Sequence, residues 1–154
     1  MLRDIYYGVN KPVPAVYKAN KAMKTGVAVV VDESTGKFDY PSSATGVNLY
    51  FVDKERIATG YKAGLTNLSD YDEVYTNIAQ NEFAKLKAYS YGDVFATDAT
   101  GTPTAGNVVV FDNTGAVADA TSGATSVYEY VGTINDNGHT LKKIKVLAVP
   151  RANS

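Results

Sequence analysis

Cysteine and tryptophan are absent from this chain of 154 residues, and histidine occurs once. Without cysteine there is no disulfide framework, no thiolate metal site and no cysteine nucleophile. His139 directly follows the Asn137-Gly138 pair, where a single histidine is typical of a solvated turn residue rather than of a catalytic base or zinc ligand. These shortages favour a protein that is not an enzyme and that carries no cofactor or metal.

A surplus of basic charge is also missing, because 15 Lys and Arg residues face 16 Asp and Glu residues. Nucleic-acid binders need a basic surface to neutralise phosphates, so a nucleic-acid partner is not expected. No apolar run reaches the ~18 residues that span a bilayer, and the segment at 1–5 lacks the apolar centre of a signal peptide. We therefore expect neither membrane insertion nor export by a cleaved signal.

Two further patterns fall short of a chemical motif. Gly60-Tyr61-Lys62-Ala63-Gly64 has glycines and a lysine but not the spacing of a phosphate-binding loop. Asp70, Asp72 and Glu73 could offer oxygens to a cation, but their spacing does not follow a calcium loop. A capped helix start or a solvated loop explains these carboxylates more simply. Paired carboxylates for glycoside cleavage are set by space, so sequence spacing leaves them open.

The residues that are abundant favour a β protein. The chain has 12 Tyr, 5 Phe and 13 Gly, together with many Val and Thr. Tyr, Val and Thr suit a pleated surface, and Gly, Asn and Asp suit the turns between strands. The expected strands lie at 26–32, near Phe38, and at 47–52, 83–89, 94–97, 106–112, 127–134 and 141–149. We predict a mainly β fold of barrel or sandwich type.

An internal similarity links two distant parts of the chain. Shifting the sequence by 80 positions places residues 26–51 on 106–131 with ten identities, among them Gly26 with Gly106 and Asp32 with Asp112. Chance would give roughly two or three identities for residues this common. Similar composition of any two β-hairpins is the alternative explanation. We interpret the pattern as two related β-units, near 26–57 and 106–149, joined by residues 58–105.

Local signals predict three further features. Asn137-Gly138 between two apolar runs predicts a tight hairpin, because both central residues need positive φ. Three lysines in 141–149 suggest an edge strand guarded against stray pairing, which Pro150 would end. The segment 69–79 is the best helix candidate, since Ser69 can cap it and its apolar residues have helical spacing.

The first 22 residues are interpreted as an extended arm before a β domain at 23–149, with a short tail at 150–154. Prolines 12 and 14 exclude a helix or a central strand there. Tyrosines in the arm need a surface to cover them, either on their own domain or on a neighbouring subunit. The candidate protein-interface residues are Tyr6, Tyr7, Pro12, Pro14 and Tyr17.

Several segments resemble small structural proteins from the head modules of tailed bacteriophages. These segments are 23–32, 50–57, 81–86, 91–97 and 130–134, so the resemblance covers most of residues 23–149. Such proteins are capsid decoration, or cement, subunits. The resemblance implies a β-rich protein that binds the outer capsid surface, with no catalytic residues.

The resemblance also implies the partners. These would be the major capsid protein and further copies of this chain, as a dimer or trimer. The protein would be made in the host cytoplasm and would reside on the capsid of the virion. Spreading binding over a repeated lattice gains from multivalency, and near-neutral charge allows dense packing. The alternatives are another virion component, such as a tail, adaptor or head-fibre base protein, and a carbohydrate-binding or adhesion module.

Overall fold

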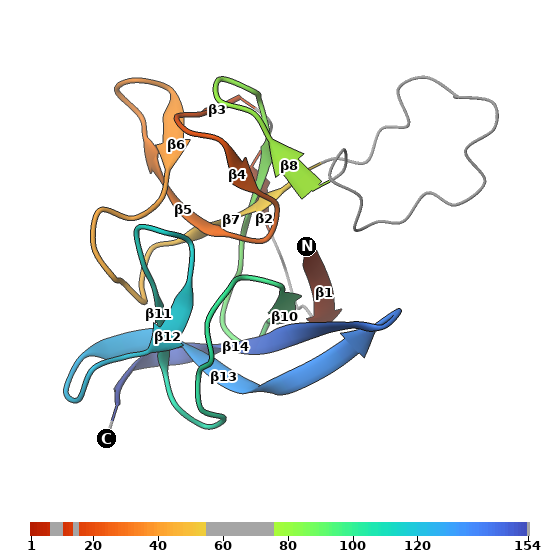
Figure 1. Ribbon diagram of the computed structural model, residues 1–154. Coiled ribbons are helices and arrows are strands. Elements are labelled where there is room, and N and C mark those ends of the chain that lie inside the picture. Colours follow the sequence, from red (N-terminus) through yellow and green to blue (C-terminus); the bar gives the residue numbers. More distant parts are fainter. Residues whose placement is uncertain (7–10, 14–15, 55–75, 154) are drawn as a thin grey trace.

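The computed structural model describes residues 1–6, 11–13, 16–54 and 76–153. Its largest sheet has six strands in the order β2-β9-β7-β5-β6-β3, and a second sheet has four in the order β1-β10-β14-β13. Two ribbons of two strands, β4-β8 and β11-β12, complete the fold (Figure 1). The prediction of a mainly β, sandwich-like fold is confirmed, and no sheet formed by the described residues closes into a barrel.

The strands have the following bounds. The first seven are β1 Leu2–Tyr6, β2 Lys11–Val13, β3 Lys18–Ala19, β4 Met23–Lys24, β5 Ala28–Asp32, β6 Lys37–Asp39 and β7 Tyr50–Asp53. The remaining seven are β8 Asn77–Ile78, β9 Lys85–Ala88, β10 Val94–Thr97, β11 Val109–Phe111, β12 Val117–Asp119, β13 Thr125–Asp136 and β14 His139–Ala152.

The main core lies between the two large sheets. Phe51 of β7 and Phe95 of β10 are fully buried and pack with their ring centroids 4.4 Å apart. Phe111 and Tyr128 surround the Phe51 ring edge-on at 5.3 and 5.6 Å. Aromatic pairs in these tilted arrangements add stability beyond the apolar area that they bury. This cluster joins strands from both halves of the chain, so the two halves share the main hydrophobic core.

The six-stranded sheet is buried on both faces at its central strands β5 and β7. Neighbouring residues on β7 enter different cores, because Phe51 belongs to the main cluster and Val52 to a second cluster. Ala28 and Val29 divide in the same way on β5. The second cluster lies under the β4-β8 ribbon and includes Ile78. Burial on both faces explains why the sequence around β5 is a continuous apolar run instead of an alternating one.

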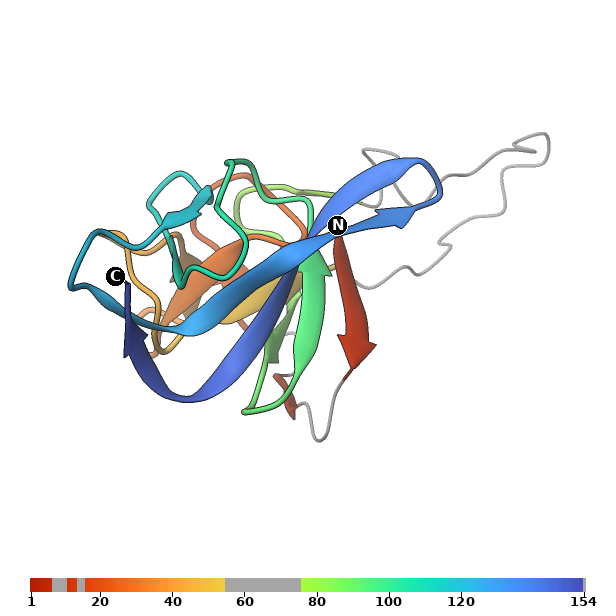
Figure 2. The same ribbon diagram turned by 90° about the horizontal axis from the view of Figure 1, so that it is seen from below.

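The long β13-β14 hairpin crosses the whole molecule (Figure 2). Asn137 and Gly138 form its turn with φ of 52° and 88°, which confirms the predicted hairpin. Two predictions about β14 are wrong, however: one based on its lysines and one based on Pro150. Strand β14 is central, between β10 and β13, so its lysines do not guard an edge. It also continues through Pro150 to Ala152, because Pro150 lies where the ladder to β13 is irregular and no amide hydrogen is required.

The N-terminal segment is extended, as expected, but the interpretation of a separate arm needs correction. Strand β1 pairs with β10, and β2 pairs with β9, so the described parts of residues 1–22 belong to the chain's own sheets. Leu2 is 4% exposed and lies in the main core. The Met1 amino group donates to the Thr25 carbonyl at 2.9 Å and pairs with Asp98. Burial of these groups ties the segment to its own fold.

The two stretches related by the 80-residue shift have corresponding elements. The hairpin β5-β6 corresponds to β11-β12, and β6 at 37–39 falls on β12 at 117–119. In each hairpin an aspartate accepts from the amide two residues later: Asp32 from Ser34 at 2.9 Å and Asp112 from Thr114 at 2.8 Å. Gly26 and Gly106 have φ of 90° and 91°. The similarity thus extends from residue identities to backbone geometry.

Two residues that the 80-residue shift aligns with each other are also in contact in the structure. Gly46 and Ser126, which are 80 positions apart, are in contact, and the Ser126 hydroxyl lies 3.2 Å from the Gly46 carbonyl. Contact between equivalent residues is expected where a local twofold axis passes between two related units. The same junction is reinforced by Thr45 and Phe111, whose amides and carbonyls exchange hydrogen bonds of 3.0 and 2.9 Å.

Other sequence predictions agree with the structure only in part. The strand predicted at 47–52 begins only at Tyr50. Most of the predicted helix at 69–79 lies outside the described residues, and its last residues include strand β8 instead. Within the described part of the chain, no helix has the length and apolar character needed to cross a membrane.

Candidate functional site

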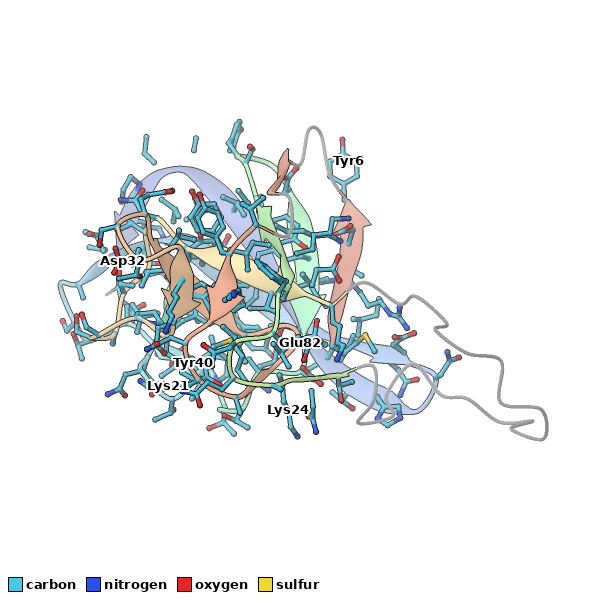
Figure 3. The ribbon with its side chains drawn as sticks, turned by 90° about the horizontal axis from the view of Figure 1, so that it is seen from above. Tyr6, Lys21, Lys24, Asp32, Tyr40 and Glu82 are labelled. Carbon is cyan, nitrogen blue, oxygen red and sulfur yellow. The ribbon has the colours of Figure 1, made fainter. Side chains whose placement is uncertain are left out.

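The predicted interface residues do not gather at one place. Tyr6 projects from the end of β1 and is 67% exposed (Figure 3). Tyr17 instead donates its hydroxyl to the Glu33 carboxylate of its own chain, at 2.8 and 2.9 Å to the two oxygens. Pro12 lies in β2 opposite Lys87. Tyr7 and Pro14 lie outside the described residues. Among the predicted interface residues whose side chains the structure describes, only Tyr6 is therefore largely exposed.

A second exposed tyrosine lies near Tyr6, at the same end of the four-stranded sheet. Tyr6 pairs with Val94 at the start of β10, and Tyr91, three residues before Val94, is 71% exposed. Val149 of β14 is 69% exposed, and β14 reaches this end because the Val146 carbonyl accepts from the Gly92 amide at 3.0 Å. Large apolar side chains left in water on one side of a protein mark an interaction surface. We call Tyr6, Tyr91 and Val149 the exposed apolar set.

A groove of about 750 Å³ opens beside this set, between the two large sheets. Strands β7 and β9 form one side of it, and β13 and β14 form the other. None of its lining residues carries a charge, and three are tyrosines. The lining consists of Val47, Asn48, Leu49, Tyr50, Ala88, Tyr89, Val127, Tyr128 and Pro150. We call this feature the tyrosine groove.

Two of the groove tyrosines are held rigidly from behind. Tyr89 stacks on Phe95 with ring centroids 4.2 Å apart, and Tyr128, which is 3% exposed, contacts Phe111 edge-on at 5.8 Å. The Tyr89 hydroxyl donates to Asp4 Oδ1 at 2.6 Å. Because core contacts fix these rings, the groove wall is preformed, which lowers the conformational entropy that a partner must overcome on binding.

An ionic network under Tyr89 joins the two sheets. Lys87 Nζ lies 2.8 Å from Asp4 Oδ2 on β1 and 3.0 Å from Asp53 Oδ2 on β7. Burial opposes the charge of Lys87, but the hydrogen bond to Asp4 and the charge of Asp53 outweigh it and raise the pKa of Lys87. The single ammonium group of Lys87 pairs with two carboxylates. Because these carboxylates lie on different sheets, the network holds the two sheets together behind the groove.

Burial affects the ionisation of two groove tyrosines. Burial, together with the nearby Asp4 carboxylate, raises the pKa of Tyr89 well above its ordinary value. Burial also raises the pKa of Tyr128 to about 12, although the Leu49 amide opposes the shift. Both hydroxyls are therefore neutral in the folded protein at pH values where an unfolded chain releases their protons.

A pH prediction follows for these tyrosines. Their contribution to stability should be complete below the ordinary tyrosine pKa of 10.0 and should fall as the pH rises above it, because only the unfolded chain then loses the protons. The free energy of unfolding should decline less steeply above pH 10 in Tyr89→Phe than in the wild type. Urea titrations across this range measure the slopes. Equal slopes, or full tyrosinate absorbance in the folded protein at pH 11, would contradict the prediction.

A larger hollow of about 870 Å³ lies away from Tyr6, where Figure 3 labels Lys24, Tyr40 and Glu82. Three of its charged side chains, those of Lys54, Glu82 and Asp98, bind groups of the same chain. Lys54 Nζ lies 2.9 Å from Glu82 Oε1 and donates to the Asn77 carbonyl at 2.7 Å, while Asp98 accepts from the Met1 amino group. No cluster of His, Asp or Glu in the described chain could hold a metal ion. The contacts at this hollow support the fold and do not define a reaction.

The carboxylates that the sequence drew attention to have structural roles where the structure describes them. Oxygen Oδ1 of Asp32 accepts from the amide and hydroxyl of Ser34 at 2.9 and 2.6 Å. Hydrogen bonds from Ser34 and Thr35 hold the pKa of Asp32 below its usual range. Asp32 thus stabilises the turn between β5 and β6. Asp70, Asp72 and Glu73 lie outside the described residues.

Sequence reasoning missed the tyrosine groove, because its lining comes from segments near residues 48, 88, 127 and 150 that only the sheets bring together. Composition gave one relevant signal, the excess of tyrosine. Comparison with known proteins places the chain in no family. No protein-family model, no curated protein and no solved structure matches it.

Proposed function

We propose that this chain is a non-enzymatic structural subunit that binds and stabilises the outer surface of a phage capsid through protein–protein contacts. The observation that carries the proposal is the exposed apolar set beside the tyrosine groove at one end of the sandwich. Tyrosine is enriched in protein interfaces because its ring supplies a large contact area while its hydroxyl tolerates water. A protein-binding role uses this end of the molecule better than catalysis would.

Three further features support a capsid partner. The sequence resembles decoration proteins of tailed phages over most of residues 23–149. The net charge of -1 allows many copies to pack closely on one shell without strong repulsion. Modest affinity per contact suffices there, because a lattice presents many equivalent sites and a dimer or trimer binds several at once. The partners would then be the major capsid protein and further copies of this chain.

The proposal predicts binding to empty shells. Capsid shells that lack this chain should co-sediment with the purified protein at a saturable ratio. The variant Tyr6→Ser/Tyr91→Ser should bind at least about tenfold more weakly, since aromatic anchors often contribute 2 kcal/mol or more to an interface. Both side chains are largely exposed, so the variant should fold.

The control for this experiment is Phe83→Ser, which removes an aromatic side chain that is 53% exposed and precedes β9 at the end opposite Tyr91. It should bind shells like the wild type. Failure of the wild type to sediment with shells would reject the capsid role. Localisation on tails or at the portal instead would favour another virion component.

The tyrosine groove also gives a specific reason to test the carbohydrate-binding alternative. Tyr50 is half-buried, and Asn48 places an exposed amide at the same groove. A ring and an amide together can contact a sugar. Reproducible binding on a glycan array, lost in Tyr50→Ala, would favour an adhesion module over the capsid role.

A further inference from the structure

We propose that the tyrosine groove, together with the adjoining stretch Leu147–Pro150 of β14, takes an extended, uncharged peptide segment of the partner protein by strand addition. This inference rests on the proposed protein-binding function and deepens it, because it names the chemistry of the bound segment. The groove and this stretch of β14 lie at the same end of the sandwich, and Pro150 belongs to both.

The backbone of β14 has an open stretch at this end. Its ladder with β10 covers only Lys142–Lys145, and Val146 is bonded to the turn at Gly92 and Asp93. On the other side, the ladder with β13 jumps from Val146 opposite Tyr128 to Arg151 opposite Ser126. No strand in the described part of the chain pairs with Leu147–Pro150. Backbone groups there can pair with an added strand, which is a common way to bind extended peptides.

The lining of the groove selects the side chains of that peptide. All nine lining residues are uncharged. A charged side chain entering the groove would lose its hydration without gaining an ionic partner, which is unfavourable. An aliphatic or proline side chain instead gains contact with the Tyr50 ring and with Pro150. The groove therefore favours a segment that is uncharged at the positions facing it.

A peptide fits this groove better than a sugar does. Sugar rings stack on open aromatic faces, but Phe95 covers one face of Tyr89 at an interplanar angle of 10°, Tyr128 is 3% exposed and Tyr50 is half-buried. The Tyr89 hydroxyl is already bonded to Asp4. Carboxylates, which often accept hydrogen bonds from sugar hydroxyls, are absent from the lining. The open backbone of β14 further favours a peptide, because it offers donors and acceptors at strand spacing.

The test uses the full chain and a random nonapeptide library displayed on yeast. Selected sequences are then synthesised with blocked ends and measured by fluorescence anisotropy. The key variant is Asn48→Asp, which places a negative charge in the groove at nearly constant shape. Its control is Asn81→Asp, another exposed asparagine with positive φ, of 65° against 55° for Asn48. Aspartate tolerates this backbone region, so both variants should fold.

Enrichment of peptides that are uncharged at alternate central positions is the expected result. Their affinity should fall at least tenfold for Asn48→Asp and should be unchanged for Asn81→Asp. The inference is overturned if no peptide is enriched, if charged peptides dominate, if both variants bind like the wild type, or if glycans alone bind. Shell binding by the wild type that is unaffected by Asn48→Asp rejects the groove but keeps the capsid role. Peptide binding by a protein that does not bind shells keeps the groove as a peptide site and rejects the capsid role.

Discussion

Replacing Gly46 with alanine should destabilise the protein by about 3 kcal/mol, at the upper end of what overpacking usually costs. An added Cβ would lie 2.0 Å from Ser126 Oγ, 2.3 Å from Ser126 Cβ and 2.8 Å from Ser126 Cα. Ser126 cannot move aside, because it is fully buried and its hydroxyl donates to the Val109 carbonyl at 2.6 Å. The clash would separate the two related β-units where they meet. Urea unfolding followed by tyrosine fluorescence measures the loss.

The comparison variant is Gly123→Ala, which adds a Cβ in open space: no atom lies within 4 Å of it, but Gly123 has φ of 80°, whereas Gly46 is not in the left-handed region. Backbone strain alone should cost that variant about 1–2 kcal/mol. Adding Ser126→Gly to Gly46→Ala removes the two nearest atoms of Ser126, so the double variant should lose less stability than the sum of the single variants. An unchanged unfolding midpoint for Gly46→Ala would contradict this account of the junction.

Replacing Lys87 with methionine should have the second large effect. The change leaves Asp4 and Asp53 facing each other without their shared cation. Removing one partner of a fully buried ion pair costs ~3–5 kcal/mol, and we expect about 2 kcal/mol here because the side chains retain partial exposure. These exposures are 13% for Lys87, 20% for Asp4 and 24% for Asp53. Lys143→Met, in the middle of β14 and outside this network, is the control.

The pH dependence of the Lys87 effect has a definite sign. The pKa of Lys87 is raised in the folded protein, so its contribution to stability is complete below the ordinary lysine pKa of 10.5 and is lost as the pH rises through the higher folded value. The difference in unfolding free energy between wild type and Lys87→Met should therefore be constant up to about pH 10 and should shrink at higher pH, where Lys87 loses its proton. A difference that stays the same above pH 10 would contradict the network.

Patterns within short segments predicted much of the fold. The β-branched run at 26–32 contains β5, and Asn137-Gly138 forms the tight hairpin turn. The 80-residue shift gave the correspondence of β6 with β12, because Asp and Gly at turns restrict the backbone locally. The first two signals depend on residues within a few positions of one another, and the third compares two such local patterns that recur 80 positions apart.

Predictions that depended on neighbours in space were wrong or incomplete. Lysines in β14 suggested an edge, but a strand between two others also exposes alternate side chains on the outer face of its sheet. Prolines near the N-terminus suggested an arm, although an extended segment with proline can equally form the edge of its own sheet, as β2 does. Sequence periodicity is the same in both arrangements, so it could not distinguish them.

The sequence by itself determined that this protein is built from strands, where its tight turns lie, and that tyrosine is its most abundant aromatic residue. Local backbone preferences and composition are sufficient for those conclusions. Only the tertiary structure decided which tyrosines are buried and which face water, and that Tyr50, Tyr89 and Tyr128 line one groove. The physical reason is that antiparallel pairing and sheet packing bring together residues separated by tens of positions in the chain. The local sequence around each residue does not encode which distant residues it will contact.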